Sequence, residues 1–60
     1  MNQNAWKALN WADYRDMQTF LESYGFAVMH DESEDDLRQA IAANVEDGTI
    51  DVNDLLATFE

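Results

Sequence analysis

The segment NWADYRDMQTFLESYG, residues 10–25, decides the fold of this chain because it carries the clearest helical pattern. Its apolar and aromatic residues recur every three or four positions, which predicts one buried face on a helix of about four turns. Asn10 is expected to cap the start of this helix, and Asp13 follows at a position where the helix dipole favours a carboxylate. Gly25 can adopt the left-handed conformation that commonly ends a helix. The predicted buried face consists of Trp11, Tyr14, Met17, Phe20, Leu21 and Tyr24.

The preceding segment NAWKAL, residues 4–9, carries Trp6 and Leu9 three positions apart. This spacing fits either a short separate helix or an extension of the helix that follows, and the sequence favours the separate helix.

The stretch HDESEDDL, residues 30–37, contains five carboxylates within residues 31–36. Ser33 followed three residues later by Asp36 matches a capping box, and Asp31 with Glu34 offers a second register. Either register predicts a helix start, because the N-terminal dipole favours acidic side chains. Its inner face is expected to contain Leu37, Ala40, Ile41 and Val45, with Asn44 and Gly48 marking its end.

Two short apolar segments lack helical spacing. FAVM, residues 26–29, is expected to form a buried extended connector, and EDGTIDV, residues 46–52, a turn followed by an extended piece. Residues 26–29 and 49–52 could pair as a minimal two-stranded ribbon. A last helix, NDLLATFE, is expected to begin at a cap formed by Asp51 or Asn53 and to turn Leu55, Leu56 and Phe59 inward. The sequence therefore predicts one mainly α domain over residues 1–60, with three or four helices and two extended links.

Composition narrows the classes of function. The 60 residues carry a formal charge of −10, from thirteen acids against Lys7, Arg15 and Arg38. Such a surface repels nucleic acid and anionic lipid, so a basic protein is the expected partner. There is no cysteine, and no apolar run approaches the roughly 18 residues that a membrane span needs. With no signal-peptide pattern, a cytoplasmic location is the default expectation.

The acidic run exceeds what capping requires, and its like charges repel one another. It is therefore expected to form a partner-binding surface, with exposed aromatic residues supplying contact energy. Six of the seven aromatic residues lie within residues 1–26, where they form either the core or a contact face, and homodimerisation through that face is an alternative. The predicted partner-binding residues are Asp31, Glu32, Glu34, Asp35, Asp36, Glu46, Asp47, Trp6, Trp11 and Tyr14.

Two other functions are compatible with the composition. The carboxylates could imitate phosphates, as in a small phage-type inhibitor of a DNA- or RNA-binding protein. Alternatively, residues 47–59 resemble the second half of an EF-hand calcium loop, with Gly48 at the sixth position and Asp54 at the twelfth. The first and third loop positions would fall on Ala43 and Val45, which have no side-chain oxygen.

The sequence predicts neither catalysis nor a resident cofactor or metal. Its two serines, Ser23 and Ser33, lack an evident base and orienting partner. His30 is the only histidine, and it is expected to lie in a loop, whereas a structural zinc site needs four organised ligands.

Overall fold

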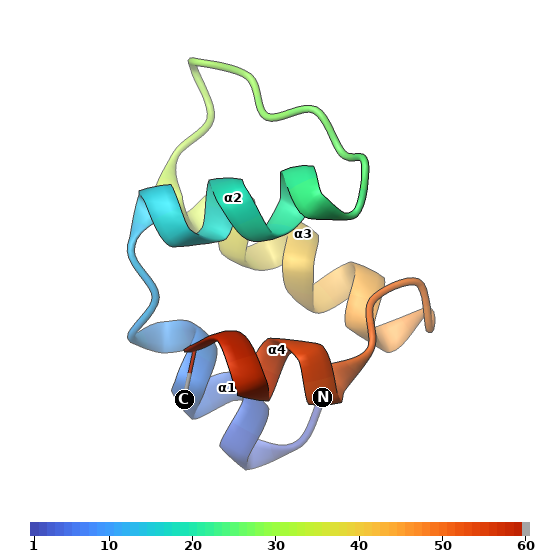
Figure 1. The fold of residues 1–60 in the computed structure, drawn as a ribbon. Helices are drawn as coiled ribbons and strands as arrows, with labels where there is room; N and C mark the ends of the chain where they lie inside the picture. Colours follow the sequence, from blue (N-terminus) through green and yellow to red (C-terminus); the bar gives the residue numbers. More distant parts are fainter. Residues whose placement is uncertain (60) are drawn as a thin grey trace.

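The structure, a computed structural model, describes residues 1–59. It confirms the mainly α fold, with four helices and no strand in this part of the chain: α1 Gln3–Asn10, α2 Tyr14–Ser23, α3 Glu34–Glu46 and α4 Val52–Phe59 (Figure 1). The separate short helix favoured for residues 4–9 is confirmed as α1. None of the helices in residues 1–59 combines the length and the apolar character needed to cross a bilayer.

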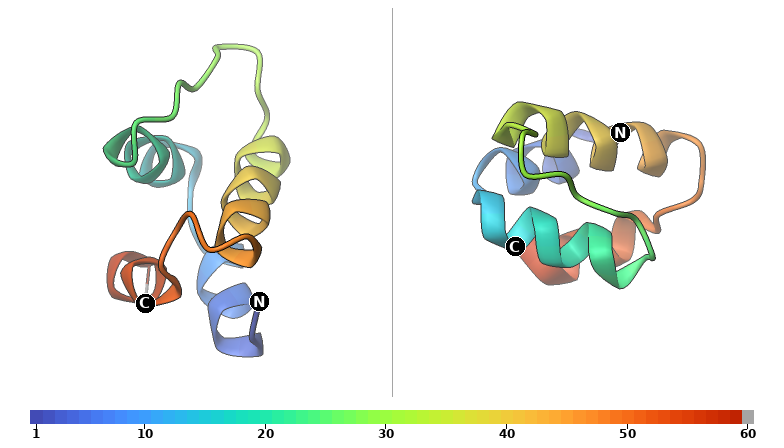
Figure 2. Two further views of the ribbon diagram at one scale, coloured as in Figure 1. Left: turned by 90° about the vertical axis from the view of Figure 1, so that its right-hand side faces the viewer. Right: turned by 90° about the horizontal axis from the view of Figure 1, so that it is seen from above.

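The helices form two pairs, α1 with α4 and α2 with α3. Figures 1 and 2 show that α2 and α3 run in roughly the same direction. The link between them, residues 24–33, therefore has to return along the length of the pair before α3 can begin. As a result, the starts of α2 and α3 lie at the same end of the molecule.

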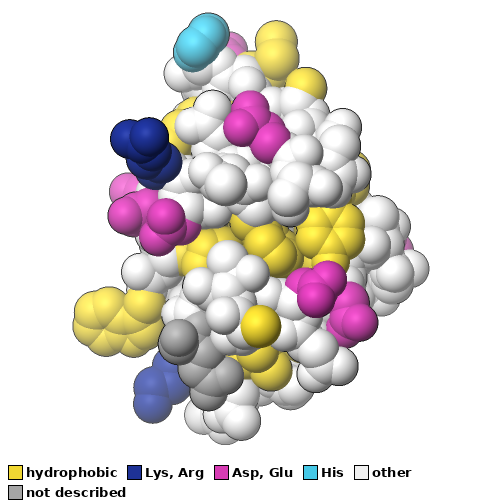
Figure 3. Space-filling model, viewed as in Figure 1, with side chains coloured by type: hydrophobic (Ala, Val, Ile, Leu, Met, Phe, Trp, Pro, Cys, Tyr) yellow, Lys and Arg dark blue, Asp and Glu magenta, His cyan; other side chains and the backbone are white. Residues whose placement is uncertain are grey.

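One cluster of buried side chains joins all four helices. Leu9, Met17, Leu37, Ile41 and Leu55 are fully buried. Ile50, in the link before α4, completes this core with 1% of its surface exposed. At the edge of the core, the Phe20 ring packs edge to face on Tyr24 and on Phe59, with centroid separations of 5.4 and 5.1 Å. Figure 3 shows hydrophobic side chains as a band between α2 and α4.

The start of α2 differs from the prediction. Asn10 is the last residue of α1 and does not cap α2; Asp13 is the cap, and it accepts a hydrogen bond of 2.8 Å from the Asp16 amide. The last turn of α1 is still completed after Asn10, because the amides of Trp11 and Ala12 donate to the carbonyls of Ala8 and Leu9. The chain therefore turns between two helices at the position where the apolar spacing predicted a continuous one.

The pairing considered possible between residues 26–29 and 49–52 does not form in the described part of the chain. The 26–29 segment is irregular, and its Phe26 and Val28 are half-buried against the core. Val52 already belongs to α4. Asp51 caps the start of this helix, because its carboxylate accepts a 2.9 Å hydrogen bond from the Asn53 amide. This cap begins the helix within the residues that the ribbon would have needed, and two strands alone are only marginally stable.

Candidate partner-binding surface

The acidic run begins α3 in the way a capping box requires. The Ser33 hydroxyl accepts a bond of 3.2 Å from the Asp36 amide, and the Asp36 carboxylate accepts one of 3.1 Å from the Ser33 amide. This arrangement confirms the Ser33–Asp36 register. Glu34 and Asp35 lie in the same first turn, where the partial positive charge of the helix end offsets some of their mutual repulsion.

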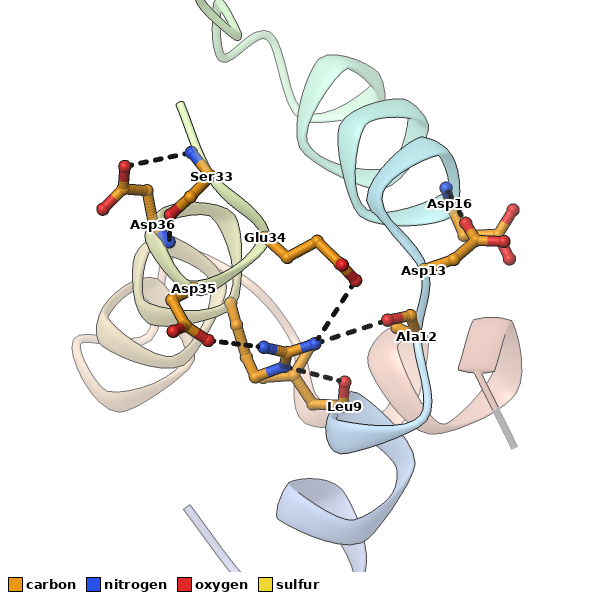
Figure 4. A network of polar contacts seen from close by, with 9 residues as sticks. Leu9, Ala12, Asp13, Asp16, Ser33, Glu34, Asp35 and Asp36 are labelled. Atoms are coloured by element: carbon orange, nitrogen blue, oxygen red, sulfur yellow. Dashed lines mark hydrogen bonds and ion pairs between the residues drawn. The ribbon is translucent and has the colours of Figure 1, made fainter. Parts of the chain in front are cut away.

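The start of α2 brings further carboxylates to the same end of the molecule. Asp13 and Asp16 lie across from Glu34, whose side chain reaches from α3 toward α2 (Figure 4). Neither aspartate belongs to the acidic run, and the spacing of the sequence does not reveal that they adjoin it. We call this combined surface the acidic end; it consists of Asp13, Asp16, Glu34, Asp35 and Asp36.

Arg38 organises the acidic end. Its guanidinium donates to the Asp35 carboxylate at 2.9 Å and lies 3.9 Å from that of Glu34. The same group donates to the backbone carbonyls of Leu9 at 3.3 Å and of Ala12 at 3.5 Å. Arg38 thus ties the first turns of α3 to the end of α1 and to the residue before the α2 cap (Figure 4).

The acidic end remains strongly negative after this pairing. Of its five carboxylates, only those of Glu34 and Asp35 pair with the guanidinium of Arg38, whose side chain is only 18% exposed. Arg15, in the first turn of α2, adds one cation nearby. The side chains of Glu34 and Asp35 are 57% and 85% exposed, so their charges remain accessible to a partner.

Four acids of the predicted surface lie outside the acidic end. Asp31 and Glu32 are in the link just before the Ser33 cap, where Asp31 is exposed and Glu32 is half-buried. Glu46 and Asp47 are at the opposite end of α3, about 18 Å from Glu34 at the usual helical rise of 1.5 Å per residue. Glu46 pairs with the α-amino group of Met1. Asp47 caps the turn that follows, and hydrogen bonds from Thr49 hold the pKa of its carboxyl below the ordinary value. These two acids therefore do not extend the acidic end.

The three aromatic residues predicted to contact a partner lie in different environments. Trp11 lies in the turn after α1 and is 82% exposed, so it does not belong to the buried face predicted for it, whereas Met17, Phe20 and Leu21 do. Trp6, on α1, is 39% exposed. Tyr14 is half-buried and donates from its hydroxyl to the Met29 carbonyl at 3.4 Å, which ties α2 to the returning link.

The calcium-like segment has its own structural roles. Ala43 and Val45 lie inside α3, and Asp54 lies inside α4, so only residues 47–51 form the link between these helices. The Asp54 carboxylate accepts a hydrogen bond from the Tyr24 hydroxyl, which raises the pKa of Tyr24 above its ordinary value. Within residues 1–59 no three acidic or histidine side chains are grouped as ligands for a metal ion.

No family model, curated protein or solved structure matches this chain. The site is therefore assigned from its own geometry. Sequence reasoning missed Asp13 and Asp16 as members of the acidic end and Arg38 as the residue that organises it. The one available signal was that Asp16 and Arg38 each sit in the first turns of a predicted amphipathic helix.

Proposed function

We propose that this protein is a non-catalytic interaction module whose acidic end binds a basic surface of another protein. The observation that supports this function is the convergence of two helix starts, which brings five carboxylates to one end of the molecule, where only Glu34 and Asp35 pair with the largely buried guanidinium of Arg38. Capping explains Asp13 and Asp36, but the exposed charges of Asp16, Glu34 and Asp35 are not needed to begin a helix. We place this activity in the cytoplasm.

The physical role of such a surface is to guide a partner. Complementary charge raises the rate of encounter and rejects acidic competitors more than it raises affinity. Salt screens exposed charges, so a complex formed through the acidic end is expected to weaken as the ionic strength rises. The same negative potential disfavours direct contact with DNA, RNA or anionic membranes.

A matched pair of variants tests the proposal. Asp16→Asn with Glu34→Gln removes two charges from the acidic end, and Glu22→Gln with Glu46→Gln removes two charges elsewhere. Wild-type protein and both variants would be immobilised and exposed to lysate of the source cells, and each captured protein would then be purified and titrated. The expected partner is basic, and its affinity falls at least about tenfold for the first variant, because close charge pairs at interfaces contribute 1.5 kcal/mol or more, as an order of magnitude.

The control variant, with the same net charge, is expected to bind nearly as well as wild type. Equal losses for the two variants would show that net charge alone, and not the acidic end, drives the binding. If the partner itself binds nucleic acid and the present protein displaces that nucleic acid, the acidic end imitates phosphates. Catalytic turnover by the purified protein would contradict the proposal outright.

A further inference from the structure

Arg38 connects the two groups of carboxylates that make up the acidic end. Its guanidinium pairs with Asp35 at 2.9 Å in the first turn of α3, and it also donates to the Ala12 carbonyl at 3.5 Å. Ala12 directly precedes Asp13, whose carboxylate caps α2 by accepting a 2.8 Å hydrogen bond from the Asp16 amide. A short series of bonds therefore runs from the carboxylates of α3 to those of α2 through one side chain (Figure 4).

Apolar packing by itself does not orient the charged side chains of this end. Leu9 at the end of α1 and Leu37 in α3 are fully buried in one core, but apolar burial is non-directional. Hydrogen bonds weaken when their angles change, so a planar guanidinium fixes orientation as well as distance. Within residues 1–59, Arg38 is the only side chain whose hydrogen bonds join α3 to residues 9–12.

We infer that Arg38 is a positioning residue, which makes the acidic end selective for the spacing of a partner's basic groups. This inference rests on the proposed function. Axes of packed helices lie about 8–10 Å apart, so the carboxylates at the starts of α2 and α3 form two groups with roughly that separation. A partner with two clusters of cations at the same spacing can bind both groups at once, whereas a wrong spacing leaves one group unbound.

Peptides with a rigid spacer test this selectivity. Each end carries two residues of 2,4-diaminobutyric acid, whose short side chains limit the reach of their ammonium groups, and one to nine prolines separate the ends. Polyproline rises about 3.1 Å per residue, so three prolines match the expected spacing. NMR titration at about 0.1 M NaCl measures each affinity, because a screening length of about 10 Å limits attraction between groups that are not in contact. Wild type should bind the best peptide, near three prolines, at least about tenfold more tightly than the longest one.

Matched variants separate position from charge. Arg38→Lys keeps the net charge but loses the planar fork that holds carbonyls and carboxylates together, so the tenfold preference should fall to about twofold or less. Arg15→Lys makes the same chemical change at an exposed residue and should keep the full preference. Arg38→Met makes the acidic end more negative, and it should lose the preference while binding the longest peptide at least as tightly as wild type does.

A loss of folded protein cannot produce this result. Partial unfolding lowers the apparent affinity for every peptide by the same factor, so the ratio between two spacers does not change. Circular dichroism checks the helices of each variant, and Arg38→Lys decides the test if Arg38→Met is unfolded. An unchanged preference in Arg38→Lys, or no preference in wild type, overturns the inference while the proposed function stands. If no peptide binds wild type more tightly than a matched peptide with glutamine ends, both fail.

Discussion

Arg38 joins parts of the chain that the sequence keeps far apart. Its guanidinium binds backbone carbonyls 29 and 26 positions earlier, at Leu9 and Ala12, while pairing with Asp35 on its own helix. The Arg38 side chain is only 18% exposed, so removing it would leave carbonyl groups without a hydrogen-bond donor where water has little access. Such a loss lowers the free energy of unfolding. Arg38 therefore both shapes the acidic end and fixes the junction of α1, α2 and α3.

Replacing Arg38 with methionine tests this structural role. We expect Arg38→Met to lower the free energy of unfolding by about 2 kcal/mol, the typical worth of hydrogen bonds made by a charged group. In a domain of this size that loss corresponds to a fall in Tm of about 10 °C. Thermal and urea unfolding followed by circular dichroism measure both quantities.

The control is Arg15→Met, which makes the same change in net charge. Arg15 is exposed, and no ion pair joins it to the part of the chain that the structure describes. Its loss should change the free energy of unfolding by no more than about 0.5 kcal/mol. Equal destabilisation by the two substitutions would mean that Arg38 acts only through its charge.

Tyr24 gives the protein a predictable response to alkaline pH. The hydrogen bond to Asp54 raises the pKa of Tyr24 above its usual 10.0, so the folded state holds this proton more tightly than the unfolded chain does. The resulting stabilisation is fully present below pH 10.0 and is lost as the pH rises through the raised value. Wild type should therefore exceed Tyr24→Phe in stability at neutral pH, with the difference vanishing in strong alkali.

Absorbance of tyrosinate measures this shift directly. The titration step of Tyr24, with its midpoint above pH 10.0, should be absent from Tyr24→Phe and present in the control Tyr14→Phe. A single step with the same midpoint in both variants would show that the Tyr24–Asp54 bond has no effect in solution.

Each helix begins where a short polar side chain can accept a backbone amide. Asn2, Asp13 and Ser33 cap α1, α2 and α3, and Asp51 does the same for α4. Gly25, with a φ of 89°, takes the left-handed conformation expected just beyond the end of α2. Such signals are local, which is why three or four helices could be predicted while their limits shifted by a few residues.

The capping box of α3 provides a test for one element. Ser33→Ala removes the acceptor for the Asp36 amide and should lower the free energy of unfolding by about 1 kcal/mol. In hydrogen-exchange measurements, the amides in the first turn of α3 should be the first to exchange faster than in wild type. Ser23→Ala, at the last residue of α2, is the matched control. It should have a smaller effect because the Ser23 hydroxyl only donates to the nearby Phe20 carbonyl.

The whole molecule is small enough for every charge to interact with most of the others. Its Cα atoms span 28 × 21 × 16 Å, comparable to the screening length of about 30 Å at 0.01 M salt. With a formal charge of −10, the folded state is destabilised by self-repulsion. NaCl should therefore raise Tm between about 10 and 500 mM, because the screening length falls several-fold over this range.

A smaller rise for the Glu22→Gln and Glu46→Gln variant, whose formal charge is less negative, would attribute the effect to net charge. If both proteins showed the same rise, it would come from a general salt effect on apolar burial instead.

Local chemistry in the sequence determined the helical class of this protein, the capping box at Ser33, the stop at Gly25 and the inward faces of α3 and α4. These features depend on residues within one or two turns of each other, so their spacing is sufficient to predict them. Only the tertiary structure decided that Trp11 is exposed, that Glu46 and Asp47 lie away from the other acids, and that Asp13 and Asp16 adjoin Glu34. The returning link and the long-range bonds of Arg38 set those positions, because which residues become neighbours depends on how helices pack and not on the order of residues within any one of them.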